Sequence, residues 1–144
     1  MNVPKGPDHY VAGTQTLEEH MTRTMLGGKI HRATVTAADL NYEGSLTVDQ
    51  ELLEAADILA GEAVDVWDVS NGARLRTYTI PGPRGSGIVC ANGAAAHLVR
   101  VSDLIIIASF VELDDAAAQT WRPSVVFVDA ANHITERRPE RLAA

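Results

Sequence analysis

The sequence has few cysteines, few lysines and no long apolar run, and each shortage excludes a class of protein. Its one cysteine, Cys90, excludes an intrachain disulfide, and with five dispersed histidines it gives no zinc-ligand spacing. The longest apolar run, residues 104–111 with one serine inside it, is far shorter than a membrane span. No basic region followed by an apolar one opens the chain. We therefore expect a cytoplasmic protein that holds no metal and contacts no membrane.

Lysine is scarce among the basic residues, because ten of them are arginines and only Lys5 and Lys29 are lysines. Lys5 lies in a polar N-terminal segment, which leaves Lys29 as the one candidate for Schiff-base chemistry on a lysine. We therefore expect no pyridoxal phosphate. An electron sink for an amine substrate would have to come from another group.

The net charge of −7 argues against a general nucleic-acid binder, which needs a basic surface to contact phosphates. An acidic small substrate stays compatible with this charge, since a few arginines or lysines can dominate the potential of one pocket. The length of 144 residues suits one domain with a real core. We expect that core to span residues 21–130. Residues 1–20 read as an N-terminal extension, either disordered or encoded from an upstream start codon, and residues 131–144 as a polar C-terminal tail that frays.

One amphipathic helix and several short strands are predicted within the core. The helix follows Asp49 as its N-cap and ends at Gly61, with one apolar face made by Leu52, Leu53, Ala56 and Leu59. A first strand lies within residues 21–36. Further strands are expected at residues 63–69, 74–80, 86–91, 103–111 and 124–130, separated by turn signals at 71–72, 81–83, 92–93 and 114–115. This spacing favours a small β-barrel with one or two helices.

The residues that could carry chemistry are weak signals when each is taken alone. The dipeptide Gly-Ser occurs twice, at Gly44-Ser45 and at Gly85-Ser86, and it is common in ordinary turns. No Ser-His-Asp order is recognisable. In a regular strand over residues 74–80, Arg74 and Tyr78 share one face and Thr77 takes the other, which is typical of a solvated surface. Taken alone, these features indicate only a small barrel of unknown function.

The combination of motifs is far more specific than any one of them. The stretches RTMLGGKIHRATVTAADLNYEGS, NGARLRTYTI, RGSG, NGAAAH and TWRP follow one another in that order. In order and spacing, from Met21 to about Asp129, they resemble the aspartate 1-decarboxylase family, with residues 42–45 as the most specific element. The resemblance implies a mainly β fold, a double-psi β-barrel with short helices. It also implies a homotetramer of cleaved α and β chains with active sites between neighbouring subunits.

The resemblance also implies a cofactor that the chain makes from its own backbone. The Ser45 hydroxyl attacks the Gly44 carbonyl carbon, the resulting ester eliminates, and hydrolysis leaves a pyruvoyl group at position 45. A β chain then ends at Gly44, and an α chain begins with the pyruvoyl group. This group would form a Schiff base with L-aspartate, releasing CO2 and β-alanine for pantothenate and coenzyme A biosynthesis. Glycine at position 44 suits this reaction because it leaves the carbonyl unobstructed and permits strained backbone angles.

Further site residues carry roles that the resemblance implies. Tyr78 corresponds to the proton donor to the substrate carbon, a role that a phenol hydroxyl can serve. Thr77 is a candidate to stabilise the oxyanion during cleavage. Arg74 suits a bidentate grip on a carboxylate, and Lys29 is a second cation. The remaining implied substrate-binding residues are Asn92, Gly93, Ala94 and Ala95. Three further residues match family positions as either supporting or substrate-contacting groups: His31, Tyr42 and Trp67.

One tension and two alternatives stay open. A regular strand sends Thr77 and Tyr78 to opposite faces, although both are expected near the pocket, so either the strand bends or Thr77 approaches the cleavage site from another side. The chain could be a binding module of the same fold that does not cleave itself, or a pyruvoyl enzyme for another amino acid. Arg74 and Lys29 favour a substrate with two carboxylates. The sequence does not say whether cleavage needs a maturation helper protein.

Overall fold

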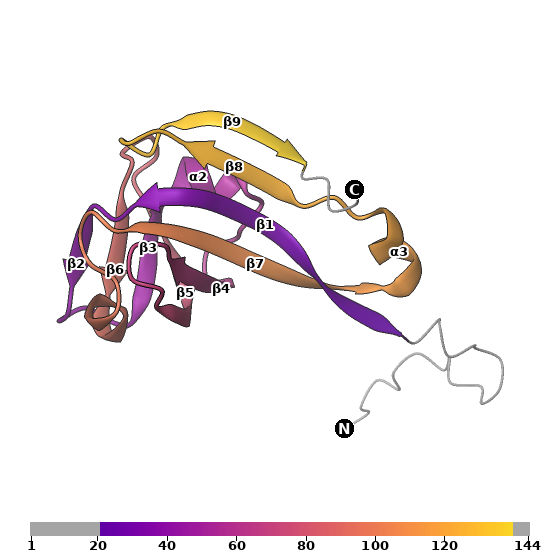
Figure 1. Ribbon diagram of the computed structural model, residues 1–144, viewed down its shortest axis with the longest axis horizontal. Coiled ribbons are helices and arrows are strands. Elements are labelled where there is room, and N and C mark those ends of the chain that lie inside the picture. Colours follow the sequence, from indigo (N-terminus) through magenta and orange to yellow (C-terminus); the bar gives the residue numbers. More distant parts are fainter. Residues whose placement is uncertain (1–20, 140–144) are drawn as a thin grey trace, which may run out of the picture. The chain divides into compact units, whose positions relative to one another are not determined.

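The computed structural model describes residues 21–139, so that the predicted extension, residues 1–20, and residues 140–144 lie outside it. Within the described range the strands are β1 (Thr22–Thr34), β2 (Ala37–Asp39), β3 (Ser45–Asp49), β4 (Ala63–Asp68), β5 (Arg74–Gly82), β6 (Val89–Asn92), β7 (Leu104–Asp114), β8 (Ser124–Val128) and β9 (Ile134–Pro139) (Figure 1). The helices are α2 (Gln50–Ala55), α3 (Asp115–Thr120) and the 3-10 helix η1 (Gly93–His97). None of these helices has the length and apolar character needed to cross a bilayer.

The strands form one mixed sheet in the order β2-β6-β3-β5-β4-β7-β1-β8-β9. Strand β3 lies between β5, which runs parallel to it, and β6, which runs antiparallel. Parallel pairs also join β1 to β8 and β2 to β6. The predicted mainly β fold is therefore confirmed, and the mixed pairing with short helices is consistent with a double-psi β-barrel.

The chain divides into two compact units. The larger comprises Leu26–Phe110 and the residues from Arg122 onward, and it contains the predicted site residues. The smaller, Met1–Met25 with Val111–Trp121, is described here from residue 21. In the smaller unit the Arg23 guanidinium bonds the Asp115 carboxylate at 2.6 Å, and this contact lowers the pKa of Asp115. Asp114 caps α3 by accepting the Ala117 N–H.

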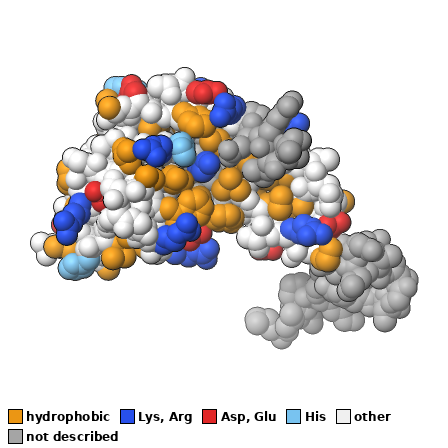
Figure 2. Space-filling view, in the orientation of Figure 1, with side chains coloured by type: hydrophobic (Ala, Val, Ile, Leu, Met, Phe, Trp, Pro, Cys, Tyr) orange, Lys and Arg blue, Asp and Glu red, His pale blue; other side chains and the backbone are white. Residues whose placement is uncertain are grey.

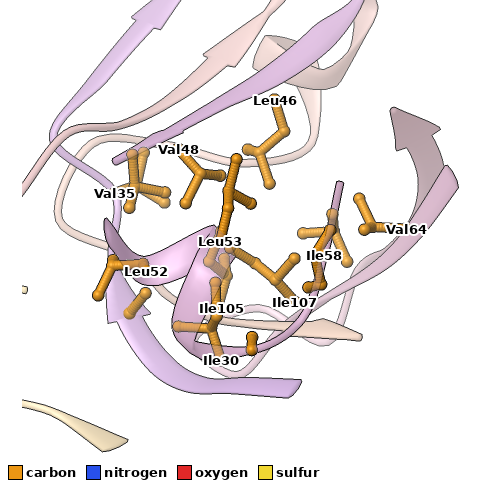
Figure 3. Packing of buried hydrophobic residues seen from close by; sticks show 14 of the residues in the cluster. Ile30, Val35, Leu46, Val48, Leu52, Leu53, Ile58, Val64, Ile105 and Ile107 are labelled. Carbon is orange, nitrogen blue, oxygen red and sulfur yellow. The ribbon is translucent and has the colours of Figure 1, made fainter. Parts of the chain in front are cut away.

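The core of the larger unit is aliphatic and is built from β1, β3, β4, β7 and α2. Its largest fully buried side chains include Ile30, Leu46, Leu53, Ile105 and Ile107 (Figure 3). Complete burial of such a side chain stabilises the fold by roughly 1.5–3 kcal/mol. Since β3 contributes Leu46 and Val48 to this core, the strand that begins at Ser45 is firmly anchored.

The predicted helix exists, but it ends six residues before Gly61. Asp57 adopts a left-handed conformation with φ of 56°, its N–H donates to the Glu54 carbonyl, and the Ile58 N–H donates to the Leu53 carbonyl. These two bonds form a Schellman motif with aspartate where glycine is usual. Ile58 therefore enters the core, whereas Leu59, predicted on the apolar face, is 72% exposed. Gly61 takes a positive φ in the following turn instead.

Two other predictions were wrong in detail. Residues 134–139 form β9, which pairs antiparallel with β8, so this part of the predicted frayed tail is a strand. Its polar residues suit the position, since β9 stands at the end of the sheet, where charged side chains are common. Pro81 and Gly82 belong to β5, and the turn follows at residues 83–88.

Candidate active site

The Gly44-Ser45 peptide bond marks the boundary between a surface loop and a buried strand. Residues 41–44 are exposed, whereas the side chain of Ser45, the first residue of β3, is completely buried. Ser45 pairs with Asn92 of β6 across an antiparallel ladder. The bond predicted to break thus has a fixed serine on one side and an accessible glycine on the other.

A buried hydrogen-bond network holds the Ser45 hydroxyl. Its Oγ donates to the Glu43 carbonyl oxygen at 3.0 Å and accepts from Asn92 Nδ2 at 3.0 Å. The other Asn92 N–H donates to Thr47 Oγ1 at 2.9 Å. Asn92 Oδ1 in turn accepts from the Cys90 thiol, with Sγ at 3.2 Å. The asparagine amide therefore uses both of its N–H groups and its oxygen.

The close approach that requires glycine in this site is at Gly93. Gly93 begins η1 with φ of 63°, and a Cβ added there would lie 2.7 Å from both N and Cα of Gly44. A Cβ added to Gly44 would meet nothing within 4 Å, and Gly44 is not among the residues with positive φ. Gly44 therefore does not use the left-handed conformation that glycine permits. The backbone at Gly93, where η1 begins, packs directly against Gly44 of the cleavage site.

A pocket of about 270 Å³ opens beside Gly44. Of the described residues, it is lined by Gly44, Leu75, Arg76, Thr77, Ala94, Ala95 and Leu98. It therefore brings together the predicted cleavage-site glycine, Thr77 and the two alanines of the predicted substrate-binding loop. Arg76, which the sequence analysis did not single out, also lines it, and its guanidinium bonds Asp65 at 3.1 Å.

Arg74 and Tyr78 lie on the opposite face of β5 from Thr77. Exposure alternates along the strand, with Arg74 and Tyr78 exposed and Thr77 partly buried. The Arg74 guanidinium stacks over the Trp67 ring at 5.1 Å, and Trp67 contacts Phe110 with ring centroids 6.4 Å apart. The alternation of exposure leaves the tension between Thr77 and Tyr78 in place within this single chain. Neither Arg74 nor Tyr78 lines the pocket beside Gly44.

The remaining predicted residues are dispersed over other elements. Lys29 lies in β1 opposite Val125 of β8 and is partly buried. His31, two residues further along β1, packs edge-on against Phe127 with ring centroids 5.4 Å apart. Tyr42 is 52% exposed in the loop before the cleavage site. In this single chain, neither Lys29 nor His31 lines the pocket beside Gly44.

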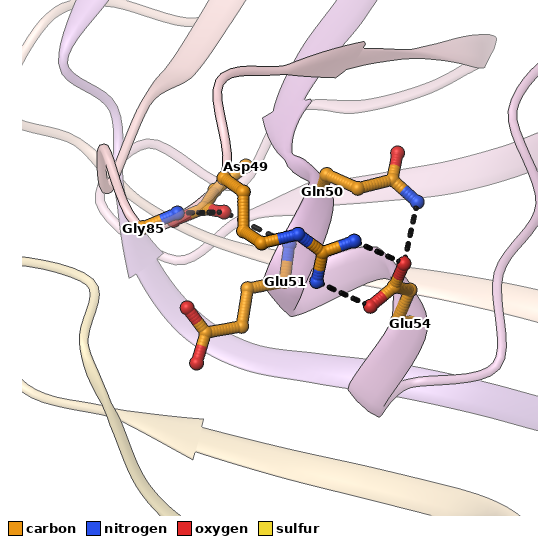
Figure 4. Close-up of polar contacts among 6 residues, drawn as sticks. Asp49, Gln50, Glu51, Glu54 and Gly85 are labelled. Atoms are coloured by element: carbon orange, nitrogen blue, oxygen red, sulfur yellow. Dashed lines mark hydrogen bonds and ion pairs between the residues drawn. The ribbon is translucent and has the colours of Figure 1, made fainter.

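The second Gly-Ser dipeptide belongs to a turn closed by Asp49. Asp49 Oδ1 accepts the N–H groups of Glu51 and Gly85, each at 2.9 Å (Figure 4). Asp49 Oδ2 accepts the N–H group of Gly87, also at 2.9 Å. Ser86 Oγ donates to the Pro83 carbonyl within the same turn. The Asp49 carboxylate thus caps α2 and closes the turn at the same time.

An ion pair flanks this turn on the surface. Arg84 binds the Glu54 carboxylate with two short hydrogen bonds, and Glu54 also accepts from Gln50 (Figure 4). The Arg84 guanidinium is the main reason that the pKa of Glu54 falls to about 2. Both side chains are exposed, so solvent screens the pair and its contribution to stability is small.

Outside the pocket beside Gly44, a buried carboxyl group lies next to a partly exposed one. Asp68 is 3% exposed, and its Oδ1 accepts the N–H groups of Ser70 and Asn71. Burial, and then a hydrogen bond shared with Asp103, raises the pKa of Asp68. The same shared hydrogen bond lowers the pKa of Asp103, which also accepts the Arg100 N–H. Within residues 21–139, no group of three or more His, Cys, Asp or Glu side chains is arranged to hold a metal ion.

The fold and the network around Ser45 can now be compared with known proteins. The sequence model of the aspartate decarboxylase family matches residues 21–135, most of the chain. The chain belongs to the aspartate decarboxylase family, and it is a decarboxylase. It is similar to the aspartate 1-decarboxylase of Moorella thermoacetica (strain ATCC 39073 / JCM 9320), with 60% identity over 115 residues. That alignment covers 80% of this chain and 90% of the relative.

Proposed function

We propose that this protein is an aspartate 1-decarboxylase that makes a pyruvoyl cofactor by cleaving its own chain between Gly44 and Ser45. The observation that carries the proposal is the environment of Ser45. Its hydroxyl is buried and held by two hydrogen bonds, and the neighbouring glycine lines a pocket that can admit a small substrate. The name of the Moorella relative supports aspartate as the substrate.

Self-cleavage begins with Ser45 and needs no other nucleophile. Its Oγ attacks the Gly44 carbonyl carbon, and the acyl group moves from the Ser45 nitrogen to its oxygen. Elimination then removes the Cα proton of residue 45 and breaks its Cβ–Oγ bond, so that Oγ leaves with the Gly44 carboxylate. Water adds to the remaining unsaturated residue at Cα, and ammonia departs, which leaves a methyl ketone next to the carbonyl of position 45.

The neighbouring residues suit this reaction. The Asn92 N–H donates to Ser45 Oγ and stabilises the negative charge that develops there as the hydroxyl proton leaves. Thr77 lines the same pocket as Gly44, where its hydroxyl is a candidate to donate to the developing oxyanion on the Gly44 carbonyl. The exposed loop before Ser45 gives water access to the cleavage site.

The same residues fit a pyruvoyl group at position 45. Asn92 and Thr47 place polar groups beside this position, and Ala94 and Ala95, with their small side chains, line the pocket next to Gly44. A pyruvoyl ketone supplies the electron sink for decarboxylation of an amine substrate. Tyr78 is assigned the return of a proton to the substrate carbon, and Arg74 and Lys29 the binding of its carboxylates. These three roles rest on the family resemblance.

We further propose that the active site is completed by a second copy of the chain within a homotetramer. Thr77 lines the pocket beside Gly44, whereas Arg74 and Tyr78 do not, although Arg76 between them does. A single chain therefore brings neither the proposed proton donor nor Arg74 into the pocket at the cleavage site. Near Arg74, the ring of Phe110 is partly exposed and contacts the Trp67 ring. Apolar side chains also lie exposed among Lys and Arg side chains in the larger unit (Figure 2).

The test of the proposed function is an assay for CO2 and β-alanine with L-aspartate as substrate. Wild-type protein should form both products in equal amounts. Ser45→Ala should form neither, because it lacks the source of the ketone. L-glutamate should be a much poorer substrate, although one methylene changes binding by only about 1–3 kcal/mol. Decarboxylation of L-aspartate by Ser45→Ala would overturn the mechanism, and a stronger activity on another amino acid would overturn the substrate.

A further inference from the structure

The Asn92 amide is hydrogen-bonded to three other side chains on one face of the β3–β6 ladder. In that antiparallel register Ser45 pairs with Asn92, and Thr47 pairs with Cys90. Because side chains alternate along a strand, residues two apart share a face. Ser45, Thr47, Cys90 and Asn92 therefore form a compact group, and all four of them take part in the observed hydrogen bonds.

The two hydroxyls in this group do not by themselves fix which way the amide points. A serine or threonine hydroxyl can donate or accept, so Ser45 and Thr47 could satisfy either the nitrogen or the oxygen of Asn92. The thiol of Cys90 is different, because its S–H is a donor and its sulfur accepts only weakly. Asn92 is 3% exposed, so water does not compensate for a wrong orientation. With the amide inverted, its N–H groups would face a poor acceptor.

The thiol is also kept in the form that donates. Burial raises the pKa of Cys90, and the negative charge of Asp39 on the neighbouring strand β2 raises it further. A thiolate at this position would have no proton to give and would repel the Asn92 oxygen. At neutral pH the Cys90 side chain therefore stays an S–H donor, 3.2 Å from Oδ1.

We infer that Cys90 is a positioning residue for self-cleavage, because its thiol holds Asn92 with the amide nitrogen toward Ser45. In this orientation an N–H group meets Oγ and stabilises it as the proton leaves. In the inverted orientation the Asn92 oxygen would accept the serine proton and oppose the growing negative charge. The inference rests on the proposed function, since it concerns the rate at which the chain cleaves itself.

The experiment follows cleavage from the moment of synthesis, in a cell-free translation reaction sampled over time and resolved into uncut and cut chains. Cys90→Ala should slow cleavage by about tenfold, which corresponds to the loss of one neutral hydrogen bond. Cys90→Ser keeps a donor, but its hydroxyl can also accept from an inverted amide, so it should cleave at a rate between those of wild type and Cys90→Ala. Melting temperatures check that each variant is folded. If Cys90→Ala does not fold, Cys90→Val takes its place, since it fills the thiol's space without a donor.

A double-mutant cycle separates positioning from a structural role. If Cys90 acts through Asn92, adding Cys90→Ala to Asn92→Ala should slow cleavage no further, whereas an independent structural effect would multiply. Equal rates for wild type and Cys90→Ala, or a double variant that cleaves more slowly than Asn92→Ala alone, would refute the positioning role and leave the proposed function intact. A wild-type chain that never cleaves would overturn both.

Discussion

Gly93 and Gly44 are packed backbone to backbone, so closely that a Cβ on Gly93 would stand 2.7 Å from the nitrogen and Cα of Gly44. This contact joins the loop after β6 to the bond predicted to break. Because of this contact, position 93 requires glycine, whatever the reaction itself requires at position 44.

Gly93→Ala is therefore expected to block or strongly slow self-cleavage. The added methyl group must displace the backbone at Gly44, and the left-handed φ of 63° costs a further 1 kcal/mol or so for alanine. Gly44→Ala is the matched control, because its methyl group meets nothing within 4 Å, and it should fold with nearly unchanged stability. Fragment formation measures the rate of self-cleavage, and the melting temperature measures the stability of each variant. Normal cleavage by Gly93→Ala would show that the contact does not matter for the reaction.

The position of Tyr78 predicts complementation between two inactive variants. Tyr78→Phe alone should still cleave itself but turn over L-aspartate poorly, because the phenol serves the substrate and not the scissile bond. Co-expressed with Ser45→Ala, it should regain part of the wild-type activity, since an intact Tyr78 and an intact Ser45 can meet between two subunits. Activity is measured on the purified mixed oligomer. Mixtures no more active than Tyr78→Phe alone would contradict shared sites.

Asp49 is expected to be the polar residue whose loss costs the most stability around α2. Its carboxylate accepts three backbone N–H groups, and the residue is 2% exposed. Asp49→Asn would turn an N–H group toward one of those donors, so we expect a loss of about 2–3 kcal/mol in the free energy of unfolding. Arg84→Ala, which removes an exposed ion pair nearby, should cost no more than about 1 kcal/mol. Urea unfolding in the uncut Ser45→Ala background measures both.

Asp68 predicts a pH dependence of stability whose sign follows from its raised pKa. The folded protein holds the Asp68 proton to a higher pH than the unfolded chain does. The stability gained from this proton is complete below the unfolded pKa and is lost as pH rises through the folded pKa. Asp103 has a lowered pKa, so its contribution is lost in the opposite direction, as pH falls.

Asp68→Asn separates these two carboxyls, because its amide can donate to Asp103 at every pH and still accept the Ser70 and Asn71 N–H groups. The variant should lose the decline in unfolding free energy that wild type shows as pH rises above about 4, the ordinary pKa of aspartate. Urea unfolding at fixed protein concentration over this range provides the comparison. An undiminished decline in Asp68→Asn would assign it to other groups.

Local patterns in the sequence predicted six of the nine strands in residues 21–139 and placed the ends of elements poorly. They missed β2, β9 and the site strand β3, since residues 41–49 read as a turn-rich passage. The alternation in β5 placed Arg74 and Tyr78 opposite Thr77, as the structure confirms. The helix end was misplaced because Asp57 takes a conformation that usually indicates glycine. Strand β9 was missed because its pairing with β8, and not its composition, makes it a strand.

The network around Ser45 was only partly predictable for a similar reason. The family resemblance predicted Asn92 as a site residue. Its bonds to Ser45 and Thr47 depend on the β3–β6 register, which brings together residues that are 47 and 45 positions apart in the sequence. The spacing of Cys90 and Asn92, two residues apart in a strand, was the one local signal. It indicates a shared face but does not identify what lies across from it.

The intact mass of the purified, denatured protein tests the central claim most directly. The account predicts two fragments, one ending at Gly44 and one beginning at position 45. The second should be lighter by one ammonia than a fragment with an N-terminal serine, because a pyruvoyl group replaces that serine. A single uncut chain after prolonged warming, with or without a maturation helper protein, would contradict the account.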